Sequence, residues 1–135
     1  MLKKIIGACA IAAATVAAPA HARAEWVRLG ETSTDTVYAD TSSIQKYRDN
    51  IFSIWIKFDR HRISRTGESY SLSQQVIDCN DYTTAVTAIT SYRNNGTVID
   101  SFNYDGDDWD GLVPGSAFGQ TFIDLCTRLN REKTW

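Results

Sequence analysis

The chain has few histidines and cysteines, which many catalytic and metal centres use. Its 135 residues include two histidines, three cysteines and one methionine. The sequence contains no H-E-x-x-H motif, no C-x-x-C pair and no glycine-rich phosphate loop. A Ser-His-Asp arrangement would have to use His61, because the other histidine lies in the N-terminal segment discussed below. Arg60 and Arg62 flank His61, and two guanidinium groups disfavour the imidazolium that a general base must become. The sequence thus favours a solvated loop histidine, no cofactor and no enzymatic activity.

Long hydrophobic runs are also missing. The longest, Ile5 to Ala18, is shorter than the roughly 20 residues that a membrane-spanning helix needs. It follows two lysines and precedes Ala22-Arg23-Ala24, a small-x-small cleavage site. This order predicts a signal peptide over residues 1–24, an exported chain that begins at Glu25, and no transmembrane segment in that chain. We expect the protein in the periplasm or at the cell surface.

Removing residues 1–24 from the 135 leaves 111, which suits one domain over residues 25–135. Three of the 14 basic residues leave with that segment, so 11 face 16 acidic ones, a formal charge of about −5. Such a balance argues against non-specific binding of nucleic acid or anionic lipid over the whole surface.

Cysteine is scarce, and its use agrees with export. Cys9 lies in the signal segment, where lipidation is disfavoured because the apolar run follows this cysteine instead of preceding it. Cys79 and Cys126 remain, an even pair for which a disulfide is the default prediction in an oxidising compartment. The alternative, a thiol nucleophile or a metal pair, lacks partners, and we expect no metal site.

The remaining chain is rich in strand patterns. The segment from Asn50 to Asp59 alternates most clearly, and Trp55 lies on the face opposite its apolar residues, which are Phe52, Ile54, Ile56 and Phe58. Asp40 is expected to end a short strand and to open a turn or one helical turn at Thr41-Ser42-Ser43. The predicted strands are Glu25–Leu29, Thr36–Ala39, Asn50–Asp59, Glu68–Asp78, Thr83–Tyr92 and Thr97–Tyr104.

Two details of these strands are less regular. Val76-Ile77 upsets the alternation of its strand, which predicts a bulge or an end of pairing before Cys79. A helix over residues 84–91 is the alternative to the strand Thr83–Tyr92. Asn94-Asn95-Gly96 predicts a hairpin with a type I′ turn, because both central positions of that turn need positive φ.

A helix is predicted near the C-terminus. Pro114 and Gly115 break the preceding strand, and Ser116 is a good N-cap. The apolar residues that follow share one helical stripe: Phe118, Phe122, Leu125, Cys126 and Leu129. Strands with short connections followed by one helix predict an α+β fold, in which a C-terminal helix covers one face of a single antiparallel sheet of about six strands. A Cys79–Cys126 disulfide would fix the packing.

The ordered set of motifs resembles the surface-adhesin protein E-like family of exported bacterial proteins, over nearly the whole predicted domain. The resemblance implies a small antiparallel sheet with a disulfide-linked C-terminal helix, and adhesion to host extracellular proteins. The matching residues are Trp26, Val37-Tyr38-Ala39-Asp40, Ser43-Ile44, Ile54-Trp55-Ile56, Tyr70-Ser71, Asp78-Cys79, Tyr92, Gly96-Thr97-Val98-Ile99, Trp109, Pro114-Gly115-Ser116 and Cys126.

Four side chains are candidates for binding. Arg60, Arg62 and Arg65 form a basic cluster between two predicted strands, either a solubilising loop or a patch that recognises an anionic glycan, phosphate or acidic partner. Trp55 would be exposed, or buried by a partner, if the helix covers the other face. The acidic run Asp105–Asp110 fails the spacing of a calcium loop and favours a solvated loop.

These features predict a non-enzymatic, adhesin-like binding module that contacts a protein or glycan, and the alternative is a periplasmic accessory or inhibitor protein that acts on an envelope component. An open sheet edge would also permit a homodimer.

Overall fold

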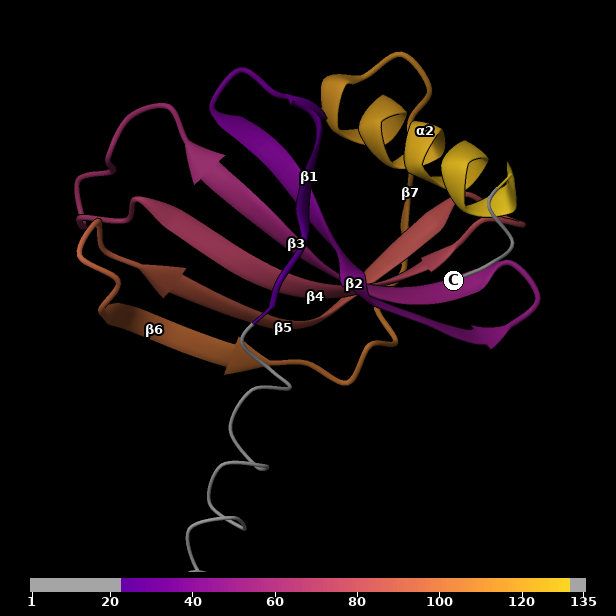
Figure 1. The fold of residues 1–135 in the computed structure, drawn as a ribbon, viewed down its shortest axis with the longest axis horizontal. Coiled ribbons are helices and arrows are strands. Elements are labelled where there is room, and N and C mark those ends of the chain that lie inside the picture. Colours follow the sequence, from indigo (N-terminus) through magenta and orange to yellow (C-terminus); the bar gives the residue numbers. More distant parts are fainter. Residues whose placement is uncertain (1–22, 132–135) are drawn as a thin grey trace, which may run out of the picture.

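The fold is a single antiparallel sheet with one helix packed on it. The computed structural model describes residues 23–131, so the predicted signal segment lies almost wholly outside the described part of the chain. The elements, in chain order, are β1 (Trp26–Glu31), β2 (Asp35–Arg48), β3 (Ile51–Arg60), β4 (Tyr70–Asp78), β5 (Thr83–Tyr92), β6 (Val98–Asn103), β7 (Asp110–Gly111) and α2 (Ala117–Arg131) (Figure 1). The predicted α+β architecture is confirmed.

The first six strands form a meander in which each strand pairs with the next along the chain. All the pairings are antiparallel, as short connections require. The two-residue β7 adds to β5 beside β6 and was not predicted. Helix α2 lies on one side of the sheet, which leaves the other side without a helix among residues 23–131 (Figure 1).

Strand β2 corrects the prediction of a turn after Asp40. The strand continues to Arg48, with an irregularity between the pairs Asp40–Trp55 and Gln45–Ser53. The Asp40 carboxylate accepts hydrogen bonds from the Ser42 amide at 3.0 Å and from the Glu25 amide at 2.9 Å. Side chains therefore do compete for backbone hydrogen bonds here, but they stabilise a bulge inside one long strand and not a break between two elements.

Strand β5 is confirmed over its predicted length, and its hairpin to β6 is also confirmed. The turn type was wrong. The Gly96 amide donates to the Arg93 carbonyl at 2.9 Å, and Gly96 has φ of 85°, whereas neither asparagine has positive φ. Because only the glycine adopts a left-handed conformation, the loop is a type I turn followed by a glycine bulge.

Strand β4 ends at Asp78, just before Cys79, so the predicted end of pairing is confirmed. The nearby bulge lies on the neighbouring strand. Gln74 pairs with Ala88 and Gln75 with Val86, which leaves Thr87 as the extra residue of β5.

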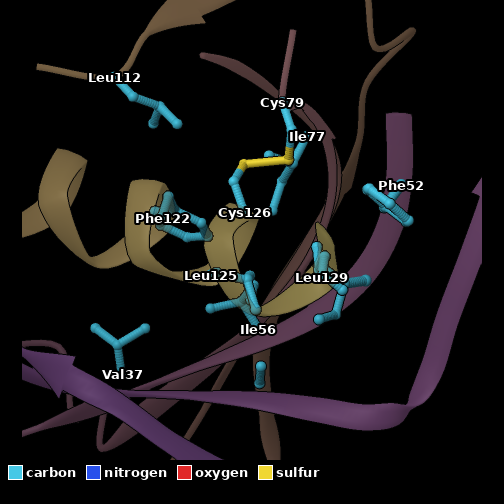
Figure 2. Packing of buried hydrophobic residues seen from close by; sticks show 12 residues of the cluster. Val37, Phe52, Ile56, Ile77, Cys79, Leu112, Phe122, Leu125, Cys126 and Leu129 are labelled. Atoms are coloured by element: carbon cyan, nitrogen blue, oxygen red, sulfur yellow. A yellow bond between two sulfur atoms is a disulfide. The ribbon is translucent and has the colours of Figure 1, made fainter. Parts of the chain in front are cut away.

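The core lies between the helix and the strands β2 to β4 (Figure 2). Phe122, Ile54 and Ile56 are fully buried there. The predicted disulfide between Cys79 and Cys126 joins the end of β4 to the helix, with the two Cα atoms 5.6 Å apart. Because these cysteines belong to the same buried cluster, the bridge is part of the packing between helix and sheet.

The start of α2 is fixed by a cap and by a close contact. Ser116 Oγ accepts a hydrogen bond from the Gly119 amide at 3.0 Å, which confirms the predicted N-cap. The same hydroxyl donates to the Val113 carbonyl at 2.7 Å. A Cβ at position 119 would lie 2.3 Å from that carbonyl oxygen, so the loop before the helix packs directly on its first turn.

Candidate binding surface

The register of the strands places three rows of side chains on the helix-free side. We call this side the open face, and we define it by the three rows. Phe52, Ile54 and Ile56 lie in the core, so the alternate residues Trp55, Lys57 and Asp59 of β3 point to the open face. Paired residues share a face, which gives the rows Trp26–Asp40–Trp55–Gln74–Ala88–Asn103, Arg28–Tyr38–Lys57–Leu72–Thr90–Ser101 and Glu31–Thr36–Asp59–Tyr70–Tyr92–Val98.

Strand β4 makes the open face less polar than a solvent-facing side usually is. Its helix-facing residues Ser71, Ser73 and Gln75 are polar and buried, and Gln75 donates to Ser73 Oγ and accepts from Thr84 Oγ1. Its residues Tyr70 and Leu72 lie on the open face instead. Tyr70 and Leu72 thus add apolar area to a face that also carries charged and polar residues, and apolar area rimmed by polar residues is typical of an interaction site.

A cluster of three tyrosines and one lysine lies on the open face, towards the end of the sheet that carries the β3–β4 loop. Tyr70 and Tyr92 stack with their ring centroids 4.8 Å apart and their planes 7° apart. The Lys57 ammonium lies 5.1 Å from the centroid of Tyr70 and 5.9 Å from that of Tyr38. The cluster, Tyr38, Lys57, Tyr70 and Tyr92, spans four neighbouring strands, and we call it the tyrosine–lysine cluster.

The cluster contains none of the four side chains predicted to bind, although its three tyrosines are among the residues that carry the family resemblance. Tyr38, Lys57, Tyr70 and Tyr92 lie far apart in the chain, and only the pairing of β2 to β5 brings them together. For Lys57 the sequence offered one signal, the alternation of β3, which places this residue on the same face as Trp55.

Trp55 lies on the open face, as predicted, and is half-buried. Its strand neighbours on either side are Asp40 and Gln74. Its amide donates to Ser43 Oγ at 2.9 Å, so the bulge of β2 holds the backbone of this residue. Trp55 therefore continues the apolar part of the open face from the tyrosine–lysine cluster.

The three arginines of the predicted basic cluster are not equivalent. Arg60 ends β3, and its guanidinium donates to the Glu68 carboxylate, which offsets its charge. Arg62 and Arg65 are exposed in the loop between β3 and β4, and no ion pair involves them among residues 23–131. Arg93 follows Tyr92 and lies beside Gly67 of that loop. This end of the sheet therefore carries Arg62, Arg65 and Arg93, of which Arg93 donates to Thr97 Oγ1 and to the Val98 carbonyl.

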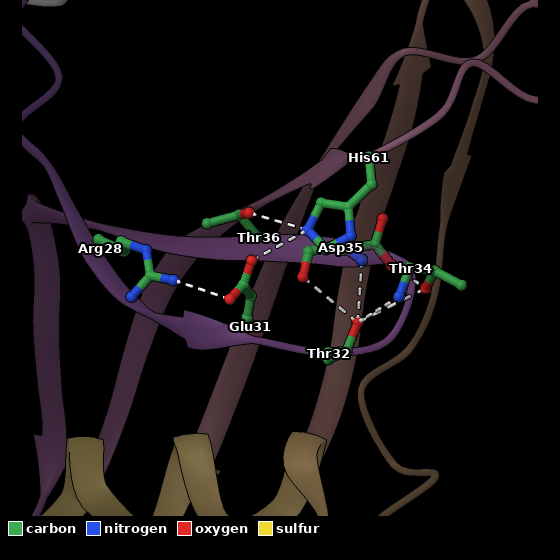
Figure 3. A network of polar contacts seen from close by, with 7 residues as sticks. All are labelled: Arg28, Glu31, Thr32, Thr34, Asp35, Thr36 and His61. Carbon is green, nitrogen blue, oxygen red and sulfur yellow. Dashed lines mark hydrogen bonds and ion pairs between the residues drawn. The ribbon is translucent and has the colours of Figure 1, made fainter.

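His61 lies in a polar network that joins two loops (Figure 3). Its Nε2 atom is 3.1 Å from Thr36 Oγ1 and 3.4 Å from Glu31 Oε1. A catalytic triad needs the hydroxyl and the carboxylate on opposite nitrogens of the ring, whereas both face Nε2 here. Glu31 also pairs with Arg28 at 3.3 Å. His61 thus links the β3–β4 loop to the β1–β2 hairpin.

The acidic loop lies at the opposite end of the sheet from Arg62 and Arg65. Together with Val86 and Ile89 of β5 it lines an open pocket of about 480 Å³, and the residues of the loop on this pocket run from Asn103 to Asp108, with Asp110. No group of three or more His, Cys, Asp or Glu side chains within residues 23–131 is arranged to hold a metal ion.

Comparisons with known proteins agree with the fold. No curated protein matches the sequence. Two solved structures of Haemophilus influenzae protein E are similar in fold. One, from a non-typeable strain, has a TM-score of 0.55 and 13% identity over 85% of this chain and 84% of that chain. The other has a TM-score of 0.52 and 14% identity over 84% of this chain and 92% of that chain.

The described part of the chain contains no helix with the length and apolarity needed to cross a membrane. The family model of the surface-adhesin protein E matches residues 26–127, which include every strand and most of α2. The chain therefore belongs to the surface-adhesin protein E family.

Proposed function

We propose that this protein is an exported, non-enzymatic, adhesin-like module that binds an extracellular protein or glycan through its open face. Membership of the surface-adhesin protein E family supports this function. The observation that carries it is the open face itself, where Trp55 and the tyrosine–lysine cluster gather on the side of the sheet that α2 does not cover. Aromatic residues are enriched where proteins bind partners, because they offer a large apolar area and a polar tip.

Export is part of the proposal. The signal peptide proposed for residues 1–24 would release a chain that starts at Glu25, one residue before β1. The Cys79–Cys126 disulfide is of the kind that persists in an oxidising compartment. Location separates adhesion from the alternative, a periplasmic accessory or inhibitor protein. Digestion by protease added to intact cells supports adhesion, whereas protection until the outer membrane is opened supports the alternative.

Binding is tested with the purified exported protein on immobilised extracellular matrix proteins and on glycan arrays. Trp55→Ala should weaken binding about tenfold or more, because buried tryptophans dominate the energy of many interfaces. The matched control is Trp109→Ala, which removes an exposed tryptophan of the acidic-loop region. Thermal melts of both variants verify that each remains folded. Equal binding by the two variants would place the interaction elsewhere on the molecule.

A further inference from the structure

We propose that the tyrosine–lysine cluster is a binding site for an anionic saccharide, one that carries carboxylate or sulfate groups. The inference rests on the proposed binding function and gives it a ligand class. Its centre is Lys57, whose ammonium lies between the rings of Tyr38 and Tyr70.

The Lys57 ammonium is held only by aromatic rings in the described part of the structure. No carboxylate oxygen of residues 23–131 lies within 4.0 Å of its Nζ atom, and no hydrogen bond links it to these residues. Two acidic residues lie near Lys57 without pairing with it. Asp59 is on the same face of β3 two residues further along, and the Asp40 carboxylate accepts hydrogen bonds from the Glu25 amide and the Ser42 hydroxyl. An ammonium offers three donors, so this one is prepared for an incoming anion.

The surroundings of Lys57 favour a saccharide. Each of the three partly exposed tyrosines combines an aromatic ring with a hydroxyl, and sugars likewise combine apolar C–H groups with hydroxyls. Strand spacing sets the width of the cluster, because the three steps from β2 to β5 cover about 14 Å. This width suits a short oligosaccharide that lies across the strands. Trp55, the neighbour of Lys57 on the same face of β3, extends the apolar surface.

The same geometry disfavours an extended acidic peptide. Peptides that bind sheets commonly add main-chain hydrogen bonds to an open strand edge. Strands β2 to β5 each have a partner on both sides along the cluster, so no edge is open there. An acidic peptide would therefore have only side-chain contacts on this face.

The distribution of charge would orient an anionic ligand. Arg93 adjoins Tyr92 in sequence, and Arg62 and Arg65 lie in the loop that precedes Tyr70. The acidic loop is at the opposite end of the sheet. Asp59 places one carboxylate beside Tyr70 at the arginine end, but the three arginines outnumber it, so a polyanion is attracted towards that end and repelled from the acidic end.

The test measures binding of heparin, hyaluronate and neutral dextran to the purified exported protein by calorimetry. We expect one or both polyanions to bind and dextran not to bind, and we expect binding to weaken as salt is raised from about 50 to about 300 mM. Heparin alone would indicate sulfate as the recognised group, and binding of both would indicate that carboxylate suffices.

Lys57→Met removes the charge and keeps the length of the side chain. It should weaken polyanion binding about 10- to 100-fold, the usual range for a hydrogen bond to a charged group. Lys57→Arg should retain most of the affinity. The control is Lys46→Met, the same substitution at an exposed lysine of β2 outside the open-face rows.

Three outcomes would overturn the inference. The protein binds neither polyanion, or Lys57→Met and Lys46→Met bind the polyanions with equal affinity, or the protein binds poly-glutamate but neither heparin nor hyaluronate. The wild-type protein supplies a test that needs no variant, because heparin or hyaluronate should shift the NMR signals of Tyr38, Tyr70 and Trp55. Shifts confined to other residues would also reject the site. Wild-type protein that binds matrix proteins but neither polyanion would remove the saccharide inference and leave the proposed adhesin function intact.

Discussion

Gly119 provides a sharp test of how α2 is seated. In an exposed helix, replacing glycine with alanine stabilises the helix by about 1 kcal/mol, because alanine loses less backbone entropy. Propensity alone therefore predicts that Gly119→Ala raises the melting temperature. The structure predicts the opposite result.

The reason is the contact between the first turn of α2 and the loop before it. A Cβ on residue 119 would lie 2.3 Å from the Val113 carbonyl oxygen, 2.5 Å from the Val113 nitrogen and 2.7 Å from Ser116 Oγ. Two of these are backbone atoms, so relief requires the loop or the helix to move. Overpacking commonly costs about 1–3 kcal/mol, and a backbone clash belongs at the upper end. After the gain in propensity is subtracted, the net loss is about 2 kcal/mol.

For a domain of this size, that loss lowers the melting temperature by about 8 °C. Thermal melts followed by circular dichroism measure it. Thr127→Ala is the control, since Thr127 is exposed on the same helix and alanine should be neutral or slightly stabilising there. A melting temperature for Gly119→Ala at or above that of the wild type would show that the loop does not pack on the helix as described.

Two further predictions concern the same junction. Replacing Cys79 and Cys126 together by alanine opens a loop with a sequence separation of 47 residues. In the chain-entropy model this should lower the free energy of unfolding by about 4 kcal/mol, which urea titrations measure. A loss below about 1 kcal/mol would contradict a structural role for the bridge. Ser116→Ala removes the N-cap and should cost about 1 kcal/mol, or about 4 °C in a thermal melt, and an unchanged melting temperature would argue against the cap.

Much of the fold could be predicted from the sequence because the signals for it are local. Alternation around Ile54 and Ile56 indicates which face of β3 is buried, and the apolar stripe that contains Phe122 indicates which side of the helix is buried. The extension of β2 beyond Asp40 could not be predicted in this way. Its bulge is stabilised by hydrogen bonds from the amides of Trp55 and Glu25, which are distant in sequence. The local pattern of polar residues does not reveal these partners, so by itself it indicates a turn.

The candidate site was predicted less completely than the fold. The face of Trp55 follows from the alternation of its own strand. The tyrosine–lysine cluster depends on the register of four strands, and register is set by long-range pairing that a single sequence does not reveal. The same limitation hid the ion pair of Arg60 with Glu68, which makes Arg62 and Arg65 the better candidates of that loop.

Helix α2 buries only some strands of the sheet, so the strands should differ in how readily they open. The buried cluster draws on β2, β3, the end of β4 and the helix, whereas β6 contributes nothing to it and is almost wholly exposed. Strands with few buried contacts open at a lower free energy than the core does. Backbone amides of β6 should therefore exchange with deuterated solvent well before those of β3, and the protein would melt locally from one margin while the disulfide-bonded half stays folded.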